Sequence, residues 1–69
     1  EPLFRLGQVY EKLGDRARAL HFIAEAIQRE YPRFEIENEP ILRELVKDPR
    51  YRDLVELATS DADRGDKSR

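Results

Sequence analysis

Few side chains in this sequence of 69 residues have the chemistry that catalysis requires. His21 is the single histidine and the natural candidate for a general base. A histidine base needs a nucleophile beside it and a third group that orients it. The only serines, Ser60 and Ser68, fall in a polar C-terminal segment that is unsuited to hold a nucleophile in place. The residue types therefore predict that the chain is not an enzyme, and that His21 is a half-exposed helix residue.

The sequence also offers poor ligands for a metal ion. It contains no cysteine, and a single histidine is too few for an ordinary zinc site. Glu35, Glu37 and Glu39 alternate along the chain and could contact a divalent cation. They lack the glycine and the oxygen spacing of a calcium loop, so a solvated acidic strip is the favoured interpretation. No metal, cofactor or catalytic residue is predicted.

Charge is abundant but balanced. Charged residues make up 41% of the chain, and 13 basic against 15 acidic side chains leave a net charge of -2. Arg50 and Arg52 flank Tyr51, which is a weak signal for nucleic acid, but acidic residues interleave with the basic ones throughout. Nucleic acid and anionic membranes attract proteins through clustered cations. We expect neither as a partner.

The sequence carries no strong targeting signal. No apolar run approaches the roughly 20 residues that span a bilayer, and Glu1-Pro2-Leu3 is neither an initiator methionine nor part of a signal peptide. Together with the absence of cysteine, this predicts a cytoplasmic protein and a piece of a longer chain. Arg64-Gly65-Asp66 matches the tripeptide that adhesive proteins present to integrins, but so short a match arises easily by chance.

Apolar spacing predicts the elements that hold these residues. Apolar side chains recur at three- and four-residue steps from Leu3 to Leu13, as in a helix with one buried stripe. Gly14 suits a left-handed helix end, and Asp15 suits an N-terminal cap. A tight turn should therefore lead into a second, antiparallel helix from about Arg16 to Glu30, which Pro32 ends.

The rest of the chain divides into three segments. Residues 32–38 are predicted to form an extended connector, because Phe34 and Ile36 alternate with charged residues and can anchor it under the helices. A cap followed by a proline then occurs twice, at Asn38 and at Asp48, which predicts a short closing helical hairpin over residues 39–58. Residues 59–69 are polar and are predicted to be a disordered tail. The predicted core comprises Leu3, Leu6, Tyr10, Leu13, Ala19, Leu20, Ile23, Ala26, Ile27, Phe34, Ile41, Leu45, Tyr51, Leu54 and Val55.

Several small and aromatic residues in the first two helices stand at a familiar spacing. They are Leu6-Gly7, Tyr10, Gly14-Asp15, Ala19 and Ala26. With them, residues 1–31 resemble the tetratricopeptide repeat, a helix-turn-helix unit of about 34 residues that stacks into superhelical scaffolds. In that family the small residues allow close helix crossing, and the tyrosine fills the space between helices. The sequence departs from the pattern at Ile23, where a large aromatic is usual, and in its late proline after Tyr31.

The residues after the connector resemble the shortened closing hairpin at the C-terminal end of some bacterial repeat arrays. This part of the resemblance covers residues 39–45 and 48–54. The resemblance implies an all-α fold of two antiparallel helical hairpins, a fragment of a right-handed superhelix. One repeat would be followed by a shorter closing pair.

The resemblance also implies a ligand-facing concave surface on the first helix, with Phe4, Gln8, Glu11 and Lys12 at the matching positions. Repeats that clamp the C-terminal carboxylate of chaperone tails carry asparagine where this chain has Phe4 and Gln8, so that ligand class is not expected. Phe4 would suit a groove for an apolar anchor of a peptide or helix. Alternatively, Phe4 packs on a neighbouring segment, as exposed aromatics usually do.

These features predict a non-catalytic protein-protein interaction module, or the C-terminal unit of a tetratricopeptide-like scaffold. The expected partner is a protein or peptide of unknown identity, with a homodimer or packing on upstream repeats as further arrangements. An accessory or regulatory domain of a larger enzyme is one alternative. A purely structural cap, which covers the last apolar face of an array, is the other.

Overall fold

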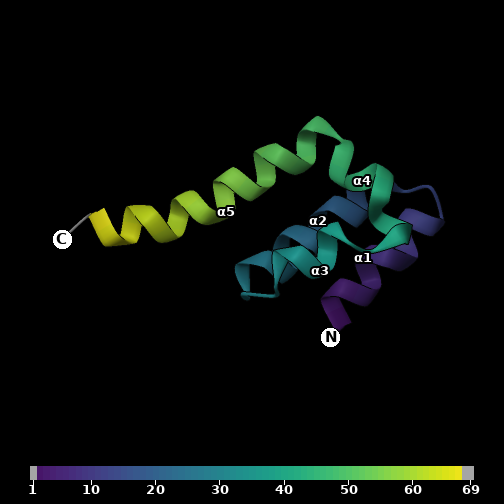
Figure 1. Cartoon of the computed structure of the whole chain (residues 1–69), viewed down its shortest axis with the longest axis horizontal. Helices are drawn as coiled ribbons and strands as arrows, with labels where there is room; N and C mark the ends of the chain where they lie inside the picture. Colours follow the sequence, from purple (N-terminus) through teal and green to yellow (C-terminus); the bar gives the residue numbers. More distant parts are fainter. Residues whose placement is uncertain (1, 68–69) are drawn as a thin grey trace.

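The computed structural model describes the backbone of residues 2–67 and the side chains of residues 2–58. Within this part of the chain the regular structure is helical and no strand is present, so the predicted all-α class is confirmed. The elements are α1 (Pro2–Lys12), α2 (Arg16–Gln28), α3 (Arg33–Glu37), the 3-10 turn η1 (Pro40–Leu42), α4 (Arg43–Lys47) and α5 (Pro49–Lys67). In Figure 1, α1 and α2 lie side by side, and α5 leaves the body of the molecule as one long helix.

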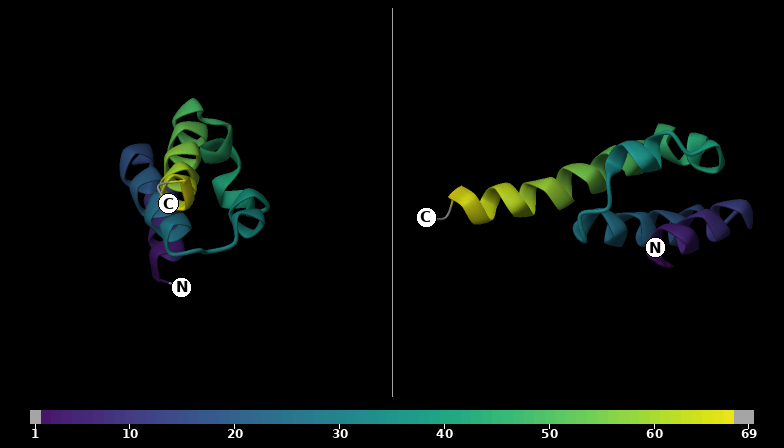
Figure 2. Two further views of the ribbon diagram at one scale, coloured as in Figure 1. Left: turned by 90° about the vertical axis from the view of Figure 1, so that its left-hand side faces the viewer. Right: turned by 60° about the horizontal axis from the view of Figure 1, so that its bottom comes forward.

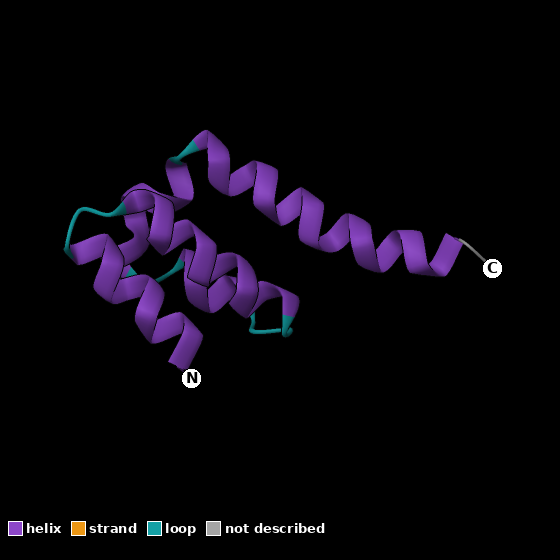
Figure 3. Ribbon diagram, turned by 180° about the vertical axis from the view of Figure 1, so that it is seen from behind, coloured by secondary structure: helices purple, strands orange, loops and turns teal. Residues whose placement is uncertain are grey.

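The helices form two layers. Figure 2 shows α1 and α2 in one layer and the segment from α3 to α5 in the other, joined by the chain that follows α2. The view from behind in Figure 3 shows that only short loops separate the helices and that the far end of α5 projects beyond both layers. No helix within the described residues is long and apolar enough to cross a membrane.

The turn between α1 and α2 follows the prediction. Gly14 has a left-handed backbone, with φ of 83°, and its N–H donates to the carbonyl of Glu11 at 3.1 Å. The N–H of Asp15 donates to the carbonyl of Tyr10 at 2.9 Å, which closes the helix end. The Asp15 carboxylate then accepts from the N–H of Arg18 at 3.1 Å and caps α2. Both predicted roles, the glycine end and the aspartate cap, are confirmed.

The end of α2 uses the same hydrogen-bond pattern without glycine. Its last residue is Gln28, two residues before the predicted end. Glu30 takes the left-handed position with φ of 69°, and its N–H donates to the carbonyl of Ile27 at 2.9 Å. The N–H of Tyr31 reaches back to the carbonyl of Ala26, also at 2.9 Å. The backbone therefore terminates the helix ahead of the proline that was expected to do so.

The first two helices approach closely at Gly7. A Cβ atom at this buried position would lie 2.5 Å from Cδ1 and 2.7 Å from Cγ1 of Ile23, which is itself fully buried. Ala19 lies on the same side of α2, with its carbonyl oxygen 3.5 Å from that point. A residue without a side chain is therefore required at position 7 for this spacing.

Residues 32–38 correct the predicted extended connector. Arg33–Glu37 form the short helix α3. In an extended chain Phe34 and Ile36 would point to the same side, whereas residues two apart on a helix point to nearly opposite sides. Ile36 is accordingly fully buried, and Phe34, which was predicted to be in the core, is 65% exposed.

The predicted cap at Asn38 is also wrong. Its side-chain amide donates to the carbonyl of Phe34 at 2.7 Å, so Asn38 ends α3 instead of starting the next helix. Glu39 takes the cap position of η1, where its carboxylate accepts from the N–H of Ile41 at 3.4 Å. The helix start is therefore shifted by one residue.

The cap at Asp48 is confirmed, but the predicted tail is not. The Asp48 carboxylate accepts from the N–H of Arg50 at 2.9 Å, and Pro49 is the first residue of α5. The backbone of α5 continues as a helix to Lys67 instead of becoming disordered after Ala58. Once a helix has formed, each added residue gains a hydrogen bond, and no proline follows Pro49 to stop it. The tripeptide 64–66 falls where only the backbone is described, and residues 68–69 lie outside the described part.

The hydrophobic core lies between the two layers. Its buried side chains are Ala19, Leu20, Ile23, Ala26, Ile27, Ile36, Leu42, Leu45, Tyr51 and Val55. Ile36 and Leu42 were absent from the predicted core, yet both are fully buried. Leu6, Leu13 and Ile41 were predicted to be buried but are exposed. Leu3, Tyr10 and Leu54 are half-buried. For Leu6 and Leu13 the reason is that α1 meets α2 through the side that carries Gly7.

Candidate functional site

Phe4, the first of the four predicted partner-binding residues, is engaged within the fold. Its ring stacks on that of Tyr31, with centroids 4.7 Å apart and ring planes 22° from parallel. Both rings are half-buried. The contact joins the first turn of α1 to the loop after α2, so Phe4 packs on a neighbouring segment instead of presenting a solvent-facing anchor.

Glu11 is likewise occupied. Its two carboxylate oxygens accept from Nε and Nη2 of Arg16, both at 2.7 Å, and its side chain is only 10% exposed. Gln8 is half-buried and Lys12 is exposed. The four residues therefore do not form one open surface, because two of them make contacts that hold the fold together.

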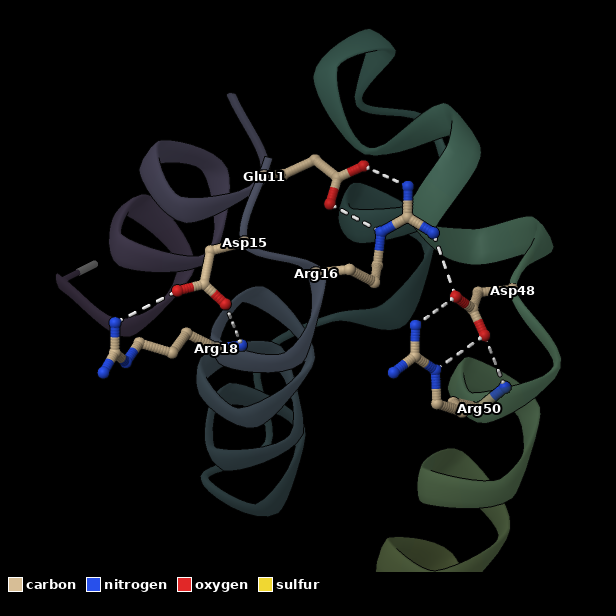
Figure 4. Close-up of polar contacts among 6 residues, drawn as sticks. All are labelled: Glu11, Asp15, Arg16, Arg18, Asp48 and Arg50. Atoms are coloured by element: carbon tan, nitrogen blue, oxygen red, sulfur yellow. Dashed lines mark hydrogen bonds and ion pairs between the residues drawn. The ribbon is translucent and has the colours of Figure 1, made fainter. Parts of the chain in front are cut away.

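A polar junction continues from Glu11 to the start of α5 (Figure 4). Arg16 also donates through Nη1 to the carboxylate of Asp48 at 2.9 Å. The guanidinium of Arg50 donates to the same carboxylate at 2.9 and 3.2 Å. Hydrogen bonds from Arg50, with a further one from Arg16, hold the pKa of Asp48 well below its usual range. The junction ties the α1–α2 turn to α5 and leaves little free charge for a ligand.

An apolar stripe lies on the side of α1 that faces away from Gly7 and Glu11. Leu6 and Val9 lie on α1, and Leu13 is the first residue after it, where its N–H still donates to the carbonyl of Val9 at 3.0 Å. At steps of three and four residues, the three side chains share one side. Their exposed fractions are 37%, 44% and 72%. We call these three side chains the outer face of α1.

The outer face of α1 has a distinct border on each side. Arg5 and Lys12 are both exposed and lie on the side next to Val9. On the other side the ring of Tyr10 stacks on Phe22, with centroids 5.5 Å apart. The guanidinium carbon of Arg18 lies 5.8 Å from the centre of the Tyr10 ring. The apolar stripe is therefore bordered by aromatic rings and cations.

A second apolar surface is the groove between α2 and α5, with a volume of about 450 Å³. It is lined by Ala17, Leu20, His21, Ala24, Arg50, Asp53, Leu54 and Leu57. His21 is 61% exposed at its rim, and its Nε2 lies 3.2 Å from the Glu25 carboxylate. No serine lies among the residues whose side chains are described, so this groove shows no nucleophile of that kind for His21.

The predicted acidic strip is partly used inside the fold. The Glu37 carboxylate accepts from the hydroxyl of Tyr51 at 2.8 Å and from the guanidinium of Arg33 at 3.0 and 3.1 Å. Burial raises the pKa of Tyr51 to about 12, and the bond to Glu37 adds to this effect. Among residues 2–58, no three histidine or carboxylate side chains are grouped so as to hold a metal ion.

No family model, curated protein or solved structure matches this chain. Sequence reasoning overlooked the outer face of α1, although one signal for it was present. The apolar residues of this helix span a wider arc than a single neighbouring helix can cover.

Proposed function

We propose that this chain is a non-catalytic protein-interaction module of tetratricopeptide-like architecture, and that its contact surface is the outer face of α1. One observation carries the proposal. Leu6, Val9 and Leu13 form a continuous apolar stripe in water on a helix whose other side is tightly packed. Contiguous exposed apolar side chains bordered by polar ones mark contact surfaces more often than chance.

The internal packing supports the proposed architecture. Gly7, Ala19 and Ala26 are buried between the helices, as expected if small residues set the crossing of a repeat. The left-handed Gly14 and the Asp15 cap give the short turn that such a unit needs.

A terminal unit of a scaffold is the second candidate. It is favoured because two of the predicted ligand-binding residues make contacts within the fold. Phe4 and Glu11 serve the fold through Tyr31 and Arg16. In this case the outer face of α1 is covered by a preceding segment of the same scaffold instead of by a separate protein. The surface is the same in both cases, and only the origin of the covering polypeptide differs.

Site-specific photo-crosslinking in the full protein, in its own cells, tests the proposal. The crosslinking amino acid p-benzoylphenylalanine replaces Leu13, which is 72% exposed, and in a matched control it replaces the exposed Arg43 of α4. We expect a discrete adduct from position 13 and none from position 43. An adduct with another polypeptide supports the interaction module, and a crosslink within the same polypeptide supports the terminal unit. Equal, weak labelling at both positions would contradict both.

A further inference from the structure

The charges on the outward side of α1 have one sign. Arg5 and Lys12 are exposed, whereas the acidic residue of the helix, Glu11, faces Arg16 and is 10% exposed. Neither Arg5 nor Lys12 has an ion-pair partner among residues 2–58. This basic border stands out on a chain whose net charge is -2.

Helix stability does not explain the charge of Arg5. It lies in the first turn of α1, which contains no acidic residue. The N-terminal end of a helix carries a partial positive charge, so a cation there is unfavourable by about 0.3–1 kcal/mol. The charge of Arg5 is therefore not offset by the dipole of α1, and it is exposed to solvent.

Both cations lie beside the same apolar residue. Arg5 is four residues before Val9 and Lys12 is three residues after it, so all three share a strip of the helix surface. The two cations are two turns apart, which is about 10 Å along the axis. A docked helix with carboxylates along one border of its apolar stripe would meet both cations while covering Val9 and Leu13.

We infer that the outer face of α1 binds an amphipathic helix of a separate polypeptide whose apolar stripe is bordered by aspartate or glutamate. This inference rests on the proposed function and specifies the partner's chemistry. Helices commonly bind through apolar anchors at three- and four-residue steps, while charges at the rim select the partner and speed association.

Two other pairings fit the charges less well. Two copies of α1 packed face to face around a two-fold axis would place the Arg5 and Lys12 borders against each other or against Arg18. Arg18 is already paired with Asp15 at 3.1 Å, and the acidic residue of α1, Glu11, faces Arg16, so neither offsets the charges of Arg5 and Lys12. In the α2–α5 groove, the charges at the rim on α5 are Arg50 and Asp53, of opposite sign, and Arg50 is already paired with Asp48. That groove has no charge preference for a partner.

Fluorescence anisotropy with two labelled peptides tests the inference. Each peptide has about 20 residues, because isolated helices shorter than about 12–15 residues are marginal in water, and it carries leucines at three- and four-residue steps. One carries glutamate beside the leucines and the other carries lysine. The protein variants are R5E/K12E and the matched control R43E/K47E. Each pair reverses one charge in the first turn of a helix and one in the last, so the change in net charge is the same in both variants.

The expected result is binding of the glutamate peptide by the wild-type chain and by R43E/K47E. The R5E/K12E variant should bind that peptide about tenfold more weakly or worse, and should prefer the lysine peptide. Wild-type affinity should also fall in about 1 M salt, where the Debye length is about 3 Å. V9Q/L13Q should lose binding of both peptides.

Three results would overturn the inference. The first is that R5E/K12E binds the glutamate peptide within about twofold of wild type. The second is that the lysine peptide binds the wild-type chain equally well. If V9Q/L13Q still abolishes binding in either case, the proposed contact surface stands and only the acidic partner is wrong. The third is that neither peptide binds. If crosslinking at position 13 is also negative in that case, the proposed function fails as well.

Discussion

The two sides of α1 differ in what their apolar side chains do. The inner side meets α2 so closely at Gly7 that an added Cβ would overlap the side chain of Ile23, and there Phe4 stacks on Tyr31. The outer side carries Val9 and Leu13, which are 44% and 72% exposed. Hydrophobic stabilisation scales with the area removed from water, so the inner side stabilises the fold more than the outer side, whose apolar side chains stay partly exposed.

The largest effect is expected from filling the inner side. Gly7→Ala should lower the free energy of unfolding by about 1–3 kcal/mol, because the added Cβ overlaps Ile23 in a packed core. The loss should appear although alanine is the better helix former by about 1 kcal/mol. Urea denaturation followed by circular dichroism measures the change.

The companion variant Ile23→Val sharpens this test. It removes Cδ1, the nearest atom to the added Cβ, but keeps Cγ1 at 2.7 Å, so it relieves part of the overlap. The double variant G7A/I23V should therefore be more stable than the sum of the two single changes implies. Additive losses would show that α1 and α2 are not in close contact at Gly7, which would contradict the packed inner side.

A smaller loss is expected from Phe4→Ala. Removing the ring should lower the free energy of unfolding by about 1–2 kcal/mol, since the aromatic pair contributes about 0.5–1.5 kcal/mol and the half-buried area of the ring adds to it. Phe34→Ala is the control, because that ring is 65% exposed and its loss should cost less than about 0.5 kcal/mol. Equal losses would mean that the first turn of α1 is not held by the ring contact.

The polar junction between the α1–α2 turn and α5 should make the free energy of unfolding depend on pH. The pKa of Asp48 is depressed in the folded chain, so its contribution is complete above the ordinary aspartate pKa and is lost as the pH falls below about 4. Asp48→Asn keeps a capping side chain but removes the charge. The urea midpoint of D48N should lie below that of wild type at pH 6 and approach it at pH 3. A constant difference between the two pH values would argue against the junction.

The smallest effect is expected on the outer side. V9Q/L13Q places glutamine, a good helix former, within and directly after α1, and removes apolar groups that are 44% and 72% exposed. The free energy of unfolding should change by less than about 0.5 kcal/mol. A loss comparable to that of G7A would show that these side chains serve the fold, and the contrast between the two sides would disappear.

Features set by neighbouring residues could be predicted from the sequence. Gly14 and Asp15 fix the first turn through their own backbone and side-chain preferences, and Asp48 does the same at the start of α5. The alternation of Phe34 and Ile36 was misleading, because a five-residue helix is too short to show its own periodicity.

Contacts between distant segments decide which side chains are buried and which residues are open to a partner, so neither could be predicted from local sequence. Apolar spacing marked Leu6 and Leu13 as buried, but only the path of α2 decides which part of a wide apolar arc is covered. The resemblance selected Phe4 and Glu11 for partner binding. Their contacts with Tyr31 and Arg16 come from other parts of the fold, and the sequence pattern does not encode which partner occupies them.

The most direct test of the central claim is an NMR titration of the ¹⁵N-labelled chain with the glutamate-bordered peptide. If the outer face of α1 is the contact surface, chemical-shift changes should concentrate at the amides of Leu6, Val9 and Leu13, with those of Leu54 and Leu57 in the α2–α5 groove unchanged. Changes concentrated at Leu54 and Leu57 instead would place the contact surface in that groove and contradict this assignment.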